Sequence, residues 1–241
     1  MAGKQTIGEI DFSEFVRCPL RTGELAYAES PELEAGKETV RWLLQLAFNG
    51  TLPLLAQVRE RYEHELDHLL RSGVIKRTYH QNRLNNVVRY SKVLHDLAVE
   101  YLVMSPVTAY DLPFGRNTVR GEYAVLTKPK RSHEPFILRL RLDMDNRVEE
   151  SKGQDVVNML RWAHFRQWEV THPQVRVLNY CLDGGRGWEE FYNEAVVRGY
   201  LNNISSQLVD KKVYPNPGSH CEACLSHRCE TEAKLEFQSH G

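Results

Sequence analysis

Residues 214–229 read YPNPGSHCEACLSHRC, and this stretch holds three of the five cysteines of the 241-residue chain. Cys221 and Cys224 form a Cys-x2-Cys pair, and Cys229 follows after four more residues. A Cys-x2-Cys turn directs two sulfurs at one centre, and a third cysteine nearby supplies most of a tetrahedral site. The surrounding proline, glycine and serine residues are typical of turns, not of a buried strand or helix. The spacing therefore indicates a metal site, for zinc or for an iron–sulfur cluster.

A site with three cysteines needs a fourth ligand, and the sequence offers two kinds. Cys18, in FVRCPLR near the start of the chain, is a remote candidate. His220 and His227 are local candidates, and either would complete a small zinc knuckle. Cys181 lies inside the apolar run VRVLNYCL, where we expect a buried thiol that packs as an apolar residue.

The composition is that of an ordinary globular protein. Apolar residues make up 41% of the chain and charged residues 26%, and no apolar run is long enough to cross a bilayer. The first residues lack the apolar core of a secretory signal. We therefore expect a cytoplasmic protein with no membrane partner, in which cysteines bind metal instead of forming disulfides. The net charge of −1 gives no overall attraction to nucleic acid.

Hydrophobic periodicity predicts a mixed α/β fold, because segments of helical spacing alternate with β-rich runs. The expected helices are a short start at 12–18, and then 36–49, 53–72, 81–104, 154–167 and 187–210. The expected strands are 119–127, 135–142 and 174–182, and a turn follows at 183–185. No linker is rich enough to divide the chain, so we expect one domain over residues 1–230 and a polar tail over 231–241.

The two cysteine segments together resemble a known family. IDFSEFVRCPLR, residues 10–21, is similar to the opening Ser-x-Phe/Leu-x-x-Cys-Pro of RecB-like PD-(D/E)XK nucleases with an iron–sulfur clasp. That group includes the AddB nuclease domain and the exonucleases of CRISPR adaptation. Residues 214–229 resemble its C-terminal segment in their prolines and closely spaced cysteines. The resemblance covers residues 10–230 and implies a RecB-like core, in which helices flank a mixed sheet.

The resemblance also implies a cofactor. In that family the N-terminal cysteine and the three C-terminal cysteines hold one [4Fe–4S] cluster. Carried over, this implies Cys18, Cys221, Cys224 and Cys229 as the ligands, with zinc as the alternative metal. Such a cluster would join the N- and C-terminal ends of the fold and close almost the whole chain as a loop.

The catalytic positions of the family are degenerate in this chain. PD-(D/E)XK chemistry uses carboxylates on adjacent strands to hold a divalent ion that activates water, together with a lysine. The family's Gly-x-x-Asp would end at position 124, where this chain has Ala124 in place of the aspartate. The family's Asp/Glu-x-Lys would fall in PFILRLRL, residues 135–142, which contains no carboxylate and no lysine. Arg41 stands near the place of the usual helix histidine, and NMLRW at 158–162 only approximates Gln-x-x-x-Tyr. We therefore expect no catalytic residues at these positions.

An active nuclease would need relocated carboxylates. Glu122 lies on the expected strand, and Asp143, Asp145 and Lys152 follow the next strand, but each is more simply interpreted as a solvated strand or turn residue. The favoured function is an inactive iron–sulfur protein that binds nucleic acid, with DNA favoured over RNA, or scaffolds the protein subunits of a DNA-processing complex. The alternative is an active, metal-dependent DNA exonuclease.

The segment HELDH, which starts at His64, matches the His-Glu-x-x-His pattern of zinc peptidases. On a helix His64 and His68 share one face, and Glu65 would act as the base. However, Tyr62 and Leu66 mark the buried side, and both histidines fall toward the charged side. A solvated helix with i,i+4 pairs explains the pattern more simply. A zinc peptidase is therefore the second and less favoured alternative.

A basic stripe runs from Arg71 to His95, with six lysines and arginines and no carboxylate. Amide and tyrosine side chains are interspersed, and these can bond phosphate or sugar oxygens and stack on bases. A solvated helix face is the competing explanation. Because the family threads single-stranded DNA past this helical region, the resemblance favours nucleic-acid binding by five residues: Lys76, Arg77, Arg83, Arg89 and Lys92.

Overall fold

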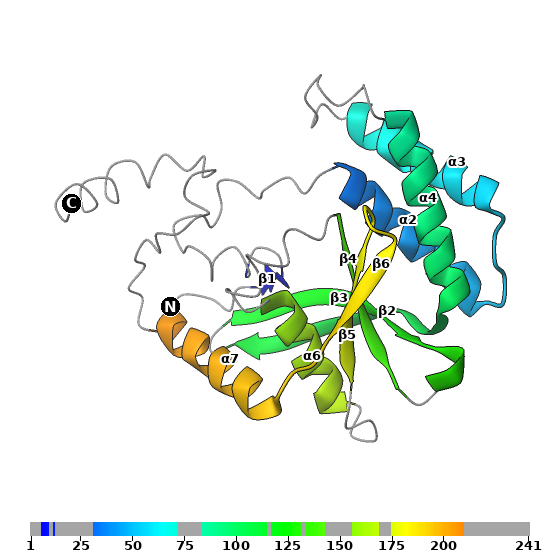
Figure 1. Cartoon of the computed structure of the whole chain (residues 1–241). Coiled ribbons are helices and arrows are strands. Elements are labelled where there is room, and N and C mark those ends of the chain that lie inside the picture. Colours follow the sequence, from blue (N-terminus) through cyan, green and yellow to red (C-terminus); the bar gives the residue numbers. More distant parts are fainter. Residues whose placement is uncertain are drawn as a thin grey trace, which may run out of the picture.

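The structure, a computed structural model, describes residues 6–9, 12, 31–71, 83–114, 117–131, 134–142, 156–168 and 175–209. The described residues form a mixed α/β fold, in which helices lie on both faces of one six-stranded sheet. Figure 1 shows α2, α3 and α4 together on one side of the sheet and α6 and α7 on the other. The expected mixed sheet flanked by helices is confirmed at this level.

The elements follow the chain in the order strand, helices, strands, helix, hairpin, helix. The helices are α2 (Pro31–Phe48), α3 (Leu55–Arg71), α4 (Arg83–Glu100), α6 (Val156–Trp168) and α7 (Glu194–Val209), with a 3-10 turn, η3, at Pro129–Arg131. The strands are β1 (Thr6–Gly8), β2 (Leu102–Phe114), β3 (Asn117–Thr127), β4 (Phe136–Arg141), β5 (Arg176–Cys181) and β6 (Arg186–Glu190).

Strand β3 organises the sheet because three strands pair with it. The antiparallel β2 runs along its whole length, and β1 and β4 share its remaining edge. The parallel pairing with β1 ends at Gly8↔Arg120, and the antiparallel pairing with β4 begins at Ala124↔Leu138. Beyond β4, β5 pairs with it in parallel and β6 pairs antiparallel to β5.

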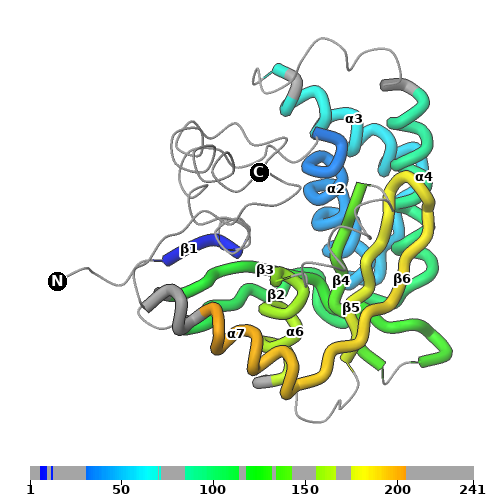
Figure 2. The backbone as a smooth tube through the Cα atoms, turned by 60° about the vertical axis from the view of Figure 1, so that its left-hand side comes forward, coloured from blue at the N-terminus to red at the C-terminus, as the bar shows by residue number. Residues whose placement is uncertain are grey.

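The edge of β3 beside residues 121–123 therefore lies between the ends of two different partner strands. We call this region, between the end of β1 and strand β4, the fork. Figure 2 shows β1 and β4 apart from each other along β3. A place where two strands separate frees backbone groups and side chains from regular pairing, so it can hold polar groups that a continuous sheet would exclude.

The alternation of side chains along the strands builds two cores. Leu126, Leu138 and Leu140 belong to the core that the sheet shares with α2, α3 and α4. Tyr123 and Ile137 belong to the other core, which α6 and α7 cover. Each face of the sheet is thus covered, which explains why five of the six residues of β4 are buried and the sixth, Arg139, is partly buried.

Helix α3 buries Val58, Tyr62 and Leu66, which recur every four residues, and its other faces are charged. The hydroxyl of Tyr62 donates a hydrogen bond of 3.1 Å to the carbonyl oxygen of Glu32 and so ties α3 to α2. This packing fixes which face of the HELDH segment is buried. The histidines of that segment are on the opposite, exposed face.

The expected helix over 81–104 is wrong at its C-terminal end. Helix α4 stops at Glu100, and the next thirteen residues form β2, which the sequence did not predict. Leu102 and Val88, two apolar residues of the expected helix, are 51% and 49% exposed. Helical spacing persists across this boundary by coincidence, whereas the long pairing with β3 determines the actual structure.

The expected helix over 187–210 is wrong at its N-terminal end. Residues 186–190 form β6, which pairs with β5 through a turn where Gly185 has a φ of +57°. Helix α7 begins only after Asn193, whose Oδ1 accepts hydrogen bonds from the backbone N–H groups of Ala195 and Val196 at 2.9 and 3.4 Å. Asparagine is a preferred N-cap residue, so Asn193 marks the true start of this helix in the sequence.

The expected buried thiol at Cys181 is confirmed. The side chain lies in the sheet with no exposure, and its Sγ donates to the carbonyl oxygen of Leu142 at 3.2 Å. The expected polar tail at 231–241 and, apart from Phe12, the expected helix at 12–18 lie outside the described residues. Within the described residues, no helix has the length and hydrophobicity required to span a membrane.

Gly121 provides the first test of this packing. A Cβ at Gly121 would lie 2.6 Å from Cδ of Glu9 and 2.7 Å from Cζ of Tyr110, and these two side chains are hydrogen-bonded to each other. We expect Gly121→Ala to lower the free energy of unfolding by about 1–3 kcal/mol, measured by urea denaturation. The control is Gly199→Ala in α7, where a Cβ meets nothing within 4 Å. It should leave stability unchanged or raise it by up to about 1 kcal/mol, and equal losses in both variants would contradict this packing.

Candidate functional site

A buried ion pair occupies the fork. Glu9 directly follows β1, and Arg161 reaches it from α6 through two bonds, one of them from Nε to Oε2 at 3.1 Å. The hydroxyl of Tyr110 donates to the same Oε2 at 2.6 Å. The side chains of Arg161 and Glu9 are only 14% and 9% exposed. The absence of a side chain at Gly121 makes room for the Glu9 carboxylate.

Arg161 also connects this pair to β4. Its Nη1 donates to the carbonyl oxygen of Leu138 at 3.3 Å. Leu138 is the residue where the pairing between β3 and β4 ends, so its carbonyl is available to a side chain. Arg161 therefore bridges the two sides of the fork, with Glu9 on one side and the β4 backbone on the other.

Two more cations surround the fork, Lys37 from α2 and Arg139 from β4. Burial and the nearby charges of Arg161 and Arg139 together lower the pKa of Lys37 to about 8. The negative charge of Glu9 has the opposite effect and raises the pKa of Lys37. Lys37 Nζ donates to Glu34 at 3.3 Å on the same helix. The lowered pKa of Lys37 therefore reflects its burial first, and then the cationic side chains of β4 and α6 that lie near it.

Arg41, the residue near the place of the family's helix histidine, is bound to carboxylates. Its Nη1 donates to Glu38 at 2.6 Å, and its Nη2 pairs with Glu122 of β3. Burial disfavours the charged form of Arg41, but Glu122 and Glu38 outweigh burial and raise its pKa above the usual range. Glu122, the nearest substitute for a catalytic carboxylate, is thus held by a guanidinium group.

A buried polar network continues from Arg139 across the carboxyl ends of β4 and β5. Arg139 donates to Oδ1 of Asn158 at 3.4 Å, and Nδ2 of Asn158 donates to Oδ1 of Asn179 at 3.1 Å. Nε of Arg141 donates to the same Asn179 oxygen at 2.9 Å. Arg141, Asn158 and Asn179 are all almost fully buried. The network therefore joins two arginines of β4 to α6 and β5.

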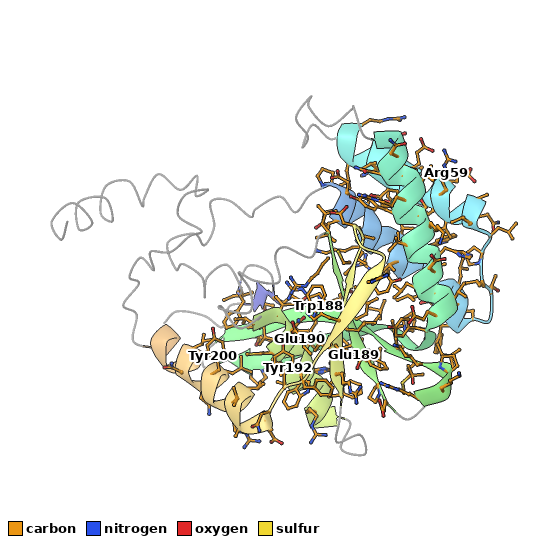
Figure 3. The ribbon with its side chains drawn as sticks, in the orientation of Figure 1. Arg59, Trp188, Glu189, Glu190, Tyr192 and Tyr200 are labelled. Carbon is orange, nitrogen blue, oxygen red and sulfur yellow. The ribbon has the colours of Figure 1, made fainter. Side chains whose placement is uncertain are left out.

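Glu190 closes this network at β6. Its carboxylate accepts from Asn158 at 3.1 Å, from Nε1 of Trp188 at 3.1 Å and from the hydroxyl of Tyr192 at 2.6 Å. The guanidinium of Arg141 lies 5.5 Å from the centre of the Trp188 ring. Figure 3 shows Trp188 and Glu190 on β6, with Tyr192 between this strand and α7.

The positions where the resemblance expects metal-binding carboxylates are apolar and packed. Ala124 lies directly opposite Leu138 in the β3–β4 register, and both belong to the core under α2, α3 and α4. Leu140 lies on the same face and is 7% exposed. A Cβ on Gly36 of α2 would meet the side chains of Leu182 and Leu140 at 3.0 and 3.1 Å. Helix α2 therefore rests directly on these leucines.

The residues expected to bind metal fall mostly outside the described residues. These are Cys18, Cys221, Cys224 and Cys229, the alternative ligands His220 and His227, and the substitute residues Asp143, Asp145 and Lys152. The part of the chain that the structure describes contains no group of three or more histidine, cysteine, aspartate and glutamate side chains placed to hold a metal ion.

The HELDH segment lies on the outer side of α3. His64 is 71% exposed, and Glu65 pairs with Arg61 at 2.5 Å. His68 is exposed as well. The two histidines therefore face solvent, without a third metal ligand among the described residues.

The basic stripe is described only in part. Arg89 pairs with Asp183 and donates to the hydroxyl of Tyr90 at 2.9 Å. Lys92 donates to Asp96 at 2.5 Å. Lys76 and Arg77 lie outside the described residues, as does the side chain of Arg83 at the start of α4. Arg89 and Lys92 are thus neighbours of carboxylates that the stripe itself does not contain.

Sequence reasoning missed the residues that meet at the fork. Glu9, Lys37 and Arg161 come from three distant segments, and no spacing rule connects them. The one readable signal was the Gly36-Lys37 pair beside an apolar helix face, since a small residue marks close packing next to a charged side chain. Their meeting point depends on where β3 exchanges one partner strand for another.

Comparisons with known proteins add little. No protein-family model matches the chain, and no curated protein matches it. A solved structure described as "Crystal structure of SSO0001" is similar over 93% of this chain and 85% of that chain, with 13% sequence identity and a TM-score of 0.31. This degree of similarity establishes neither family nor function.

The buried pair at the fork gives a second test. Arg161→Met would leave the Glu9 carboxylate buried without its cation, and we expect a loss of about 3–5 kcal/mol in the free energy of unfolding. The matched control, Arg198→Met, removes an exposed pair with Glu194 in α7 and should cost at most about 0.5 kcal/mol. Adding Glu9→Gln to Arg161→Met should recover part of the loss. Equal effects of the two single variants would show that the pair is not buried as described.

Proposed function

We propose that this chain is a RecB-like PD-(D/E)XK protein that binds nucleic acid without cutting it, alone or as a scaffold in a DNA-processing complex. A [4Fe–4S] cluster on Cys18, Cys221, Cys224 and Cys229 would join its ends. The observation that carries the proposal is the apolar packing at the expected catalytic positions, where Ala124 lies opposite Leu138.

Leucine cannot replace a carboxylate in this chemistry. A divalent ion needs oxygen ligands, and it stabilises the charge that develops on the phosphate during cleavage. Leu138 and Leu140 are 5% and 7% exposed beneath α2, so these positions offer neither ligands nor space for water. Glu122, on the same side of the sheet, is already bound to Arg41. These features support a protein that has kept the nuclease architecture without its metal chemistry.

The fork retains groups that suit binding. Lys37, Arg139 and Arg161 place cationic donors around it, and the phosphodiester backbone of a nucleic acid is an anion that such donors recognise without a metal. The basic stripe would extend this contact along α4. Binding without cleavage therefore needs no residue that the chain lacks.

The rival function, an exonuclease with relocated carboxylates, depends on Glu122. We expect the anaerobically purified protein to leave single-stranded DNA intact in Mn²⁺, because the expected metal positions hold alanine and leucine. The measurement is the release of labelled fragments on a denaturing gel, with Glu122→Ala as the matched variant. Cleavage by the parent protein that disappears in Glu122→Ala would overturn the proposal in favour of the nuclease.

The cluster has its own test. The anaerobically purified protein should be brown and contain about four irons per chain. Cys18→Ala, Cys221→Ala, Cys224→Ala and Cys229→Ala should each lose iron. The control is Cys181→Ala, which changes a thiol buried in the sheet and should keep its iron. A colourless protein that contains zinc would contradict the cluster and favour a zinc knuckle.

A further inference from the structure

We propose that the fork binds a phosphate group of a nucleic-acid strand directly, through Lys37, Arg139 and Arg161, and without a metal ion. This site rests on the proposed function, because it takes the same ligand, and it names the residues and the charge type that hold it. The three cations come from α2, β4 and α6, so only the folded chain brings them together.

The convergence of like charges is the first argument. Lys37 lies close enough to Arg161 and Arg139 for both of their charges to disfavour the charged form of Lys37. Gathering cations in a half-buried place costs free energy, and a bound anion would recover that cost. The Glu9 carboxylate is already occupied by Arg161 and Tyr110, and Glu34 accepts from Lys37. A ligand at the fork would therefore meet cationic donors whose local carboxylates are engaged, which suits an anion better than a divalent cation.

The cations are also held in fixed positions. Glu9 and Tyr110 anchor Arg161 from one side, and the Leu138 carbonyl anchors it from the other. These contacts engage Nε, Nη1 and Nη2 of Arg161 once each, while a guanidinium carries five N–H donors, so donor capacity remains for a further acceptor. Arg139 is held by a similar contact, because its Nη1 donates a hydrogen bond of 3.4 Å to Oδ1 of Asn158. Donors fixed before the ligand arrives lose little entropy on binding.

The guanidinium groups occupy the role that a metal ion plays in a nuclease. Arg161 bridges a buried carboxylate and a backbone carbonyl, which are both oxygen ligands that a metal ion would otherwise collect. A guanidinium binds phosphate oxygens through planar, paired N–H donors, but it cannot activate water as a metal does. The fork would thus hold a phosphate and leave its ester bonds intact.

A nucleic-acid strand suits this place better than a free phosphate does. The network from Arg139 runs through Asn158 and Asn179 to Arg141, whose guanidinium lies over Trp188. Trp188 is partly exposed, and an exposed indole ring is a surface on which a base can stack. A phosphate at the fork and a base near β6 would together select a polymer.

The test is fluorescence anisotropy with a labelled single-stranded oligodeoxythymidylate, in EDTA and in Mg²⁺. Parent protein should bind equally in both. Lys37→Gln and Arg139→Gln should each weaken binding roughly tenfold and reduce the slope of log affinity against log salt by about 0.7. The control, Arg198→Gln, removes an exposed cation on α7 and should bind as the parent does. Urea denaturation of each variant separates a lost contact from a lost fold.

A pH series distinguishes Lys37 from a generic positive charge. Its pKa is lowered to about 8, so its charge and the affinity for the oligonucleotide should fall as the pH rises from 7 to 9. Lys37→Arg should flatten this decline because arginine stays charged. The charged groups around Lys37 are Glu34, Glu38 and Arg41 on α2, Glu9 after β1, Glu122 on β3, Arg139 on β4 and Arg161 on α6.

The outcomes separate this site from the function on which it rests. Oligonucleotide binding that survives in both fork variants but weakens in Arg89→Gln or Lys92→Gln would overturn the fork and leave nucleic-acid binding standing. Calorimetric binding of pyrophosphate, without binding of any oligonucleotide, would overturn the nucleic-acid ligand. Affinity that requires Mg²⁺ would overturn the metal-free site. No binding of any oligonucleotide by the parent would overturn the proposed function itself.

Discussion

The bond between Glu9 and Arg161 holds the two sides of the fork together. It fixes the end of β1 against α6, and through the Leu138 carbonyl it also fixes β4 at the point where this strand leaves β3. Both side chains are nearly buried, so each depends on the other for its charge to be tolerated. Lys37 of α2 and Arg139 of β4 lie beside this pair, so their cationic side chains face a region that the pair holds in place.

The strand register places different kinds of side chain in different parts of the sheet. On the face toward α2, Ala124, Leu138 and Leu140 belong to the apolar core and supply no oxygen ligands for a metal ion. At the fork, Arg139 and Arg161 bring cationic donors together. This arrangement fits the proposed function, in which a phosphate is held but is not hydrolysed by a metal-bound water.

Sequence patterns predicted the elements well wherever local periodicity and tertiary packing agree. Helices α2 and α3, strand β4 and the buried Cys181 all carry apolar residues at the spacing of the element they form. Strands β2 and β6 were missed because their pairing partners, and not their own periodicity, determine them. The Glu9–Arg161 pair was missed for the same reason: it joins residues 152 positions apart, and only the exchange of strands along β3 brings them together.

The central claim is that the fork holds cationic side chains and does not bind a divalent metal ion. A titration of Mn²⁺ into the protein, followed by the electron paramagnetic resonance signal of the free ion, tests this claim most directly. The account predicts that the parent protein, Glu9→Gln and Glu122→Ala bind Mn²⁺ equally weakly, with or without single-stranded DNA. Tight, stoichiometric Mn²⁺ binding by the parent that is lost in Glu9→Gln or Glu122→Ala would contradict it.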